Sequence, residues 1–228
     1  MYNIKAMVEN LIDGCTTDRE KAIKLHNFVR DNIRYGITKK LDFATPEYIL
    51  ESGYGHTTAK ATLLIRLLRE AGINAMHHFV TLKKEYIQGA FPDLFEFLIP
   101  PSISHAYVEV NVNGKYYHLD SFAFEKSLFN KLQIRLRDEN KKFGYGISEM
   151  GTTEWNGESD AFAQFHPEIL EEDHGTFEDP FDYYYEYPSY KHQLFGIQFS
   201  MVVDFLASFS GKQFEIWANS NLNHLRTY

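Results

Sequence analysis

The sequence predicts an α+β fold in which N-terminal helices pack on an antiparallel sheet. Apolar residues recur at helical spacing after a capping box at residues 17–20, and a second helical stripe runs over residues 57–71. The dipeptide Asn113-Gly114 then separates two segments rich in β-formers, which is the strongest short-range hairpin signal in the chain. Helix, loop, buried helix, strand and hairpin in this order indicate an antiparallel sheet against the buried helix.

The first helix is predicted from its start signal and its apolar stripe. Thr17 and Glu20 have the spacing of a capping box. The apolar positions that follow are Ala22, Leu25, Val29 and Ile33. We expect a helix of about four turns that ends near Tyr35-Gly36. Residues 39–52 are polar and contain a proline, so we expect a loop with at most a short helix at residues 46–50.

The second helix follows the run Gly53-Tyr54-Gly55-His56-Thr57, and Gly72 closes it. Its apolar stripe consists of Ala61, Leu64, Leu68 and Ala71. We expect the side chain of Thr57 to meet the free amides and the positive end of a buried helix. That environment lowers the pKa of a thiol and helps to hold an oxyanion, so a nucleophile is favoured at this position.

The hairpin predicts which side chains share a face of the sheet. Strands are expected over residues 75–82, 105–112 and 115–120. A two-residue turn at Asn113-Gly114 pairs Tyr107 with Asp120, and His105 then points to the same face as Asp120. Diagonal neighbours have Cα atoms roughly 7 to 8 Å apart, within reach of an imidazole–carboxylate hydrogen bond. Asp120 would then fix the tautomer of His105 and stabilise its protonated form.

These segments resemble the transglutaminase-like family over about residues 17–125. The resemblance is carried by Gly53-x-Gly55-x-Thr57 and by residues 67–75, 105–110 and 117–120. The family has a cysteine at the helix start, a histidine that opens a strand and an aspartate at the end of the next strand. These positions fall on Thr57, His105 and Asp120. The resemblance implies a papain-like fold and a Cys-His-Asp site for acyl transfer or amide hydrolysis, with threonine in place of cysteine.

The threonine leaves three alternatives open. A threonine hydroxyl is far less acidic than a thiol, whose pKa is about 8.5, so it needs activation by a general base such as His105. Thr57 is either a helix cap in a catalytically silent site, a nucleophile, or a bystander while His105 and Asp120 activate water. The silent site would bind a peptide, a protein side-chain amide or a small amide. The other two alternatives describe an acyltransferase or an amide hydrolase.

The cleft offers a structural criterion between these classes. An open, polar cleft that leads to Thr57 would favour an enzyme, whereas a cleft filled by side chains from residues 145–190 would favour a binding module. The resemblance also suggests an upstream aromatic or polar group near the site. Tyr35 is either that group or an ordinary core residue with a satisfied hydroxyl.

The C-terminal half gives weaker signals. Residues 126–142 are strongly charged, and residues 144–190 mix glycine, acidic residues and aromatics around Trp155. This density of aromatics argues against disorder. The apolar segment 195–209 is expected to return to the core as a helix or a strand. We therefore predict a transglutaminase-like core over residues 1–125 and a family-specific extension over residues 126–228 that packs on it.

Composition limits the partners and cofactors. A net charge of −8 provides no broad basic surface, so no nucleic-acid partner is expected. The sequence has neither a long apolar run nor an apolar leader, which predicts a cytoplasmic protein without a membrane partner. The single cysteine, Cys15, excludes an intrachain disulfide and a multi-cysteine zinc site. His56, His105 and Asp120 could form a two-histidine, one-carboxylate face, but this spacing is not a recognised ligand motif, so neither a metal nor a cofactor is predicted.

Overall fold

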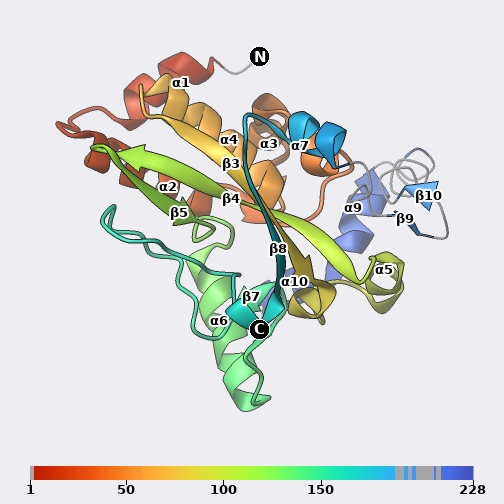
Figure 1. Cartoon of the computed structure of the whole chain (residues 1–228). Helices are drawn as coiled ribbons and strands as arrows, with labels where there is room; N and C mark the ends of the chain where they lie inside the picture. The colour runs from red at the N-terminus through yellow and green to blue at the C-terminus, as the bar shows by residue number, and fades with distance from the viewer. Residues whose placement is uncertain (1–2, 188–192, 195–196, 199–207, 209–211, 228) are drawn as a thin grey trace.

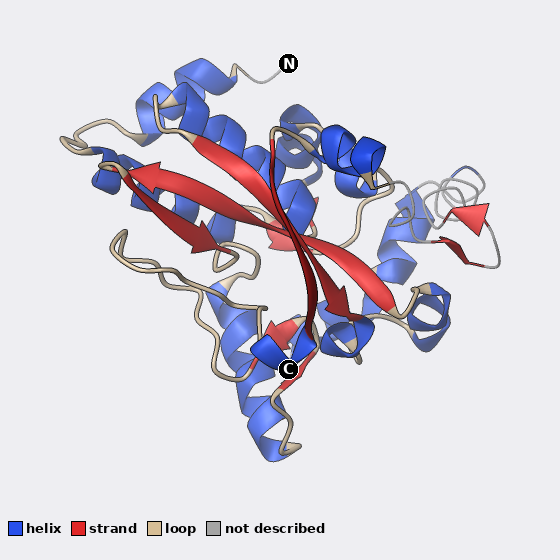
Figure 2. Cartoon of the chain, viewed as in Figure 1, coloured by secondary structure: helices blue, strands red, loops and turns tan. Residues whose placement is uncertain are grey.

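The computed structural model of the chain describes residues 3–187, 193–194, 197–198, 208 and 212–227 (Figure 1). A twisted antiparallel sheet crosses the middle of the molecule, and helices lie on both of its sides (Figure 2). This arrangement confirms the predicted α+β class.

The N-terminal helices begin at the predicted signals. Helix α1 spans Ile4–Leu11, and α2 spans Asp18–Asn32 behind a complete capping box of Thr17 and Glu20. Helix α2 has the predicted length of about four turns but ends at Asn32, before the expected Tyr35-Gly36, because Ile33 has extended backbone angles and Arg34–Tyr35 forms strand β1. Strand β1 pairs in parallel with β2, Tyr54–Gly55. This pairing ends the helical conformation after α2 and holds residues 54–55, which lead into the next buried helix.

That buried helix, α4, spans Thr57–Glu70, as predicted. It follows a short 3-10 helix η1, Leu41–Phe43, and helix α3, Pro46–Ser52, where a short helix at residues 46–50 was expected. Gly53 ends α3 with φ 68°, a left-handed conformation that glycine adopts without strain. Ten of the residues of α4 are buried, so this helix stands at the centre of the packing.

The central sheet has the strand order β5-β4-β3-β8. Its members are β3 (Ala75–Lys83), β4 (Ser102–Val112), β5 (Lys115–Leu119) and β8 (Leu170–Phe177). Asn113 and Gly114 have φ 55° and 82°, which a two-residue hairpin turn with two left-handed residues requires. Val112 pairs with Lys115 and Val108 with Leu119, so the predicted register is confirmed.

The remaining elements complete the fold around this sheet. They are η2 (Lys84–Ile87), α5 (Asp93–Leu98), α6 (Lys126–Asp138), β6 (Phe143–Gly144), β7 (Ile147–Ser148), η3 (Pro167–Ile169), α7 (Pro180–Glu186), β9 (Gln193–Leu194), β10 (Ile197–Gln198), α9 (Lys212–Ala218) and α10 (Ser220–Thr227). Of the segment 195–209, expected to return to the core, all but residues 197–198 and 208 lie outside the described residues.

Two large clusters of buried apolar residues lie on opposite faces of the sheet. One contains residues of α1, α2 and α4 together with Ala75, Val108, Val110 and Leu119. The other contains residues of α5, α6, α9 and α10 together with Val80, Leu82 and Tyr107. Strand β8 and helix α6 thus belong to the same packed body as the first 125 residues, while a division at residue 125 stays a prediction. No helix in the described part has the length and apolar character needed to cross a membrane.

Candidate active site

Thr57 is the first residue of α4 and is almost fully buried, with 3% of its surface exposed. The helix cap is the preceding residue, His56, and its side chain makes no capping hydrogen bond. The Thr57 hydroxyl donates a hydrogen bond to Oε1 of Gln164. Of the three alternatives for Thr57, the helix cap is not what the structure has, because His56 is the cap residue and the Thr57 hydroxyl donates to a side chain that lies far away in the sequence.

His105 and Asp120 lie together as the hairpin register predicts. Nε2 of His105 is 3.3 Å from Oδ2 of Asp120, which is a long hydrogen bond, and both side chains are buried. Oδ1 of Asp120 accepts hydrogen bonds from the backbone N–H groups of Ala163 at 2.5 Å and Gln164 at 3.1 Å. Oδ2 accepts a hydrogen bond from the backbone N–H of Phe165 at 3.2 Å. These three donors compensate the buried carboxylate. Because Nε2 faces Asp120, Nδ1 is the nitrogen that remains for proton transfer.

Gln164 is a site residue that the sequence did not reveal. Its side chain is fully buried, Nε2 donates to the carbonyl oxygen of Gly146 at 2.7 Å, and Oε1 accepts from Thr57. Its backbone N–H also bonds Asp120. One residue therefore holds two members of the predicted site. It lies in a segment without regular periodicity, so no local signal points to it.

Tyr35 belongs to the site and not only to the core. Burial raises the pKa of its hydroxyl to about 12, and hydrogen bonds with the side chains of Gln164 and Thr57 act in the opposite direction. Its ring stacks on Phe124 with centroids 3.9 Å apart. Tyr86 faces His105 edge-on at 6.1 Å, and burial raises its pKa well above the ordinary value. Both tyrosines are therefore neutral hydrogen-bonding groups at physiological pH.

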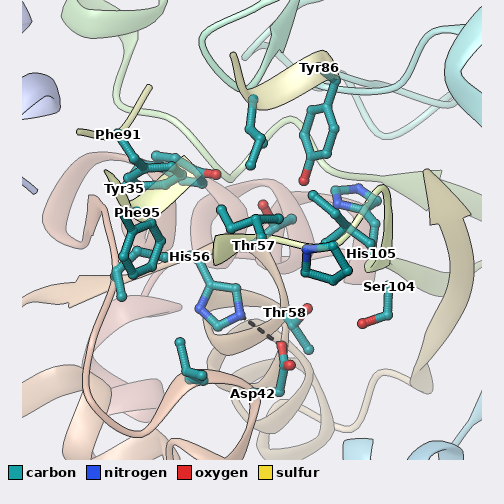
Figure 3. Close-up of a pocket in the computed structure, with 16 residues that line it drawn as sticks. Tyr35, Asp42, His56, Thr57, Thr58, Tyr86, Phe91, Phe95, Ser104 and His105 are labelled. Carbon is teal, nitrogen blue, oxygen red and sulfur yellow. Dashed lines mark hydrogen bonds and ion pairs between the residues drawn. The ribbon is translucent and has the colours of Figure 1, made fainter. Parts of the chain in front are cut away.

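A pocket of about 90 Å³ opens beside these residues, and Figure 3 shows Thr57 in its wall between Tyr35 and His105. Its apolar lining includes Ile37, Leu41, Ile87, Phe91, Phe95, Ile99 and Ile103. The pocket reaches both Thr57 and His105, and none of the described residues within 145–190 lines it, so the cleft is not filled as expected for a binding module. Its lining is mostly apolar, so it is not the open, polar cleft expected for an enzyme either, and this criterion does not separate the two classes. Gln164 does come from that segment, but it does not line the pocket; it accepts the hydrogen bond of the Thr57 hydroxyl.

The other wall of the pocket carries a chain of polar side chains. Nε2 of His56 lies 2.7 Å from Oδ1 of Asp42, and Oδ2 of Asp42 accepts the hydroxyl of Tyr184 at 2.7 Å. The Tyr184 oxygen lies 2.6 Å from Oγ of Ser104. Nδ1 of His56 is buried and has no hydrogen-bond partner within the described part of the chain. Such an unpaired polar atom at a pocket wall needs an explanation.

This pairing also settles the alternative of a metal face. His56 bonds Asp42, whereas His105 bonds Asp120. Among the described residues, these three do not form a group whose ligand atoms converge on one point. The metal face considered from the sequence is therefore not assembled.

Comparison with known proteins identifies the family of the chain. The family model of the transglutaminase-like superfamily matches residues 5–121, which is just over half of the chain. A solved structure of a Parabacteroides distasonis protein, provisionally described as a protease, matches with 20% identity and a TM-score of 0.38. That match covers 52% of this chain and 23% of the other. No curated protein matches the chain. On the strength of the family match, the chain belongs to the transglutaminase-like superfamily.

Proposed function

We propose that this protein is a binding module that holds a peptide segment or a small amide in the pocket beside Thr57, without acyl transfer. The observation that carries this proposal is the hydrogen bond from the Thr57 hydroxyl to Gln164. An amide oxygen is a poor base at neutral pH, so this bond does not prepare the hydroxyl for attack. The hydroxyl acts instead as a fixed polar group in the wall of the pocket.

The pocket suits one side chain or one small amide. Its volume of about 90 Å³ is well below the several hundred Å³ typical of sites for drug-sized ligands. Apolar residues form most of its lining, and polar groups stand at two places, near Thr57 and His105 and along the Asp42 wall. This combination favours a ligand with an apolar part and a hydrogen-bonding amide. The unpaired Nδ1 of His56 is a further group that such a ligand would satisfy.

A second candidate is a hydrolase in which His105 activates water. The observation that favours it is the intact pair of His105 and Asp120, with the carboxylate held by three backbone N–H groups. A water molecule at Nδ1 of His105 would lie near the positive end of α4, which stabilises a developing negative charge. Threonine would then be a spectator.

Ligand binding and turnover separate these candidates. We would measure both for a panel of short peptides, glutamine amides and activated esters, with the wild type and with Ile103→Trp, which fills the pocket. Ile134→Trp is the matched control, because Ile134 lies on α6 and is 57% exposed. The proposal expects binding without turnover, lost in Ile103→Trp and kept in Ile134→Trp.

The opposite outcomes are equally informative. Turnover that survives Thr57→Ala and disappears in His105→Ala would establish the water-activating hydrolase. Turnover lost in both variants would make Thr57 a nucleophile that works with His105 as one unit. Binding that is unaffected by Ile103→Trp would place the ligand outside this pocket and overturn the proposal.

A further inference from the structure

A second cluster of ionisable side chains lies on the sheet, separate from the pocket. His78, Glu109 and His118 belong to the adjacent strands β3, β4 and β5. Glu109 stands opposite His118 in the register, and His78 is diagonal to Glu109. His77 reaches Thr62 of α4, so the alternating His78 points to the face away from α4.

The three side chains converge on one point. Nδ1 of His78 lies 3.5 Å from Oε2 of Glu109, and Nε2 of His118 lies 3.0 Å from the same oxygen. All three ligand atoms lie within 4.8 Å of one another. Zinc binds imidazole nitrogen and carboxylate oxygen at about 2.0 to 2.2 Å in a tetrahedron, which separates neighbouring ligand atoms by about 3.3 to 3.5 Å. The observed separations bracket this value.

A carboxylate lies near the second ring nitrogen of each imidazole. Nε2 of His78 is 2.7 Å from Oδ1 of Asp173, and Nδ1 of His118 is 3.8 Å from Oδ2 of Asp160. Backbone N–H groups hold both acids, that of Gly175 for Asp173 and that of His118 for Asp160. Metal-binding histidines commonly direct their second nitrogen to a carboxylate, which fixes the tautomer and increases the basicity of the ligand.

The alternative is a hydrogen-bond network without a metal. In that network a neutral His78 that donates Nε2–H to Asp173 would direct the lone pair of Nδ1 at the carboxylate of Glu109. This contact is unfavourable unless the imidazole is protonated or a cation lies between the two groups. Three carboxylates around two imidazoles leave a net negative charge, which favours a divalent cation.

We propose that His78, Glu109 and His118 bind a zinc ion, with the fourth coordination position open to solvent. The side chains are 12%, 20% and 32% exposed, so an ion can reach them from the surface. His78 is also held by stacking on Tyr107, with centroids 4.5 Å apart. Bound zinc would join three neighbouring strands of the sheet. The site does not depend on the function proposed for the pocket.

The test is metal binding by the full chain with Cys15→Ser, which removes the thiol that could compete for zinc. We expect one equivalent of Zn²⁺ by calorimetry, a rise in Tm, and the visible absorption of tetrahedral Co²⁺. Glu109→Gln and His118→Ala should each weaken Zn²⁺ binding at least 10-fold. Asp173→Asn should weaken Zn²⁺ binding about 10- to 100-fold, because it removes the carboxylate that bonds the second nitrogen of the ligand His78. His224→Ala on α10 is the histidine control and should leave the Zn²⁺ affinity unchanged.

Circular dichroism without metal shows whether each variant is folded. If His118→Ala does not fold, the near-isosteric Glu109→Gln still provides the test. Absence of binding in the wild type would establish the hydrogen-bond network and overturn the proposal. Equal Zn²⁺ affinity in Glu109→Gln and the wild type would overturn it as well. Ca²⁺ binding as tight as Zn²⁺ binding would indicate the acidic groups alone, because calcium prefers oxygen ligands.

Discussion

Replacing Thr57 by cysteine tests whether the rest of the site is arranged for thiol chemistry. The introduced thiol would lie in the first turn of α4, in the pocket wall that also includes His105. A helix N-terminus and a neighbouring histidine both stabilise a thiolate, and such thiols have pKa values of about 3.5 to 7.5. We therefore expect the pH–rate profile of alkylation by iodoacetamide to have its midpoint at about pH 6.5, well below the usual thiol pKa of about 8.5.

The magnitude follows from the thiolate fraction. At pH 6, lowering a thiol pKa from about 8.5 to about 6.5 raises the thiolate fraction about 75-fold. Nucleophilicity falls with pKa at a Brønsted slope of about 0.4 to 0.5, which reduces this advantage to about 10-fold. The rate at pH 6 is therefore a better measure than the rate at pH 7, where the same two effects leave an advantage of only about 3-fold.

Thr58→Cys is the matched control, in the same Cys15→Ser background. Thr58 lies in the same helix turn, lines the same pocket and is equally buried. Figure 3 shows it on the side of Asp42, whereas Thr57 lies between Tyr35 and His105. Its thiol shares the helix end but has a carboxylate as neighbour, so its midpoint should be higher. Equal midpoints for the two thiols, or no upward shift when His105→Ala is added to Thr57→Cys, would refute the reasoning.

Two further predictions concern stability. Leu64 is fully buried in α4, so Leu64→Ala should lower the free energy of unfolding by about 2 to 5 kcal/mol in urea titrations. Leu94 is 63% exposed, so Leu94→Ala should change that free energy by less than about 0.5 kcal/mol. Similar losses in the two variants would contradict the central role of α4. Burial lowers the pKa of His26 to about 3, so this group favours folding above its unfolded pKa of about 6.5, and stability falls as pH decreases towards about 3. We expect a loss on the order of 2 kcal/mol between pH 7 and pH 5 that His26→Gln reduces, and an unchanged pH slope in that variant would exclude His26 as the cause.

Local signals in the sequence predicted the elements that position His105 and Asp120. The turn residues Asn113 and Gly114 adopt left-handed angles by themselves, and the two-residue period of the strands then fixes which side chains share a face. The start of α4 was likewise predicted, because its apolar stripe and the closing Gly72 are local features. These parts of the site depend on residues that are close together in the chain.

Other parts depend on distant contacts and carry no local signal. Strand β8 is largely polar along Leu170–Phe177 and lies at the sheet edge, so its sequence lacks the apolar alternation of a half-buried strand. Gln164 meets Thr57 across 107 positions, and Tyr184 meets Asp42 across 142. Only the folded chain brings these residues together, which explains why the polar wall of the pocket was not predicted.

The contacts of Gln164 give a physical reason for the threonine at position 57. Its Nε2 is committed to the carbonyl oxygen of Gly146, so the amide orientation is fixed and Oε1 must face Thr57. A fully buried carbonyl oxygen needs a donor, and a hydroxyl is a stronger donor than a thiol. Gln164 also holds Asp120 through its backbone N–H. Threonine therefore completes a network that keeps His105 and Asp120 in place, whereas a cysteine there would leave the amide oxygen poorly satisfied. Thr57 and Gln164 are best understood as one unit, in which the hydroxyl is a structural donor and the pocket beside it is available for binding.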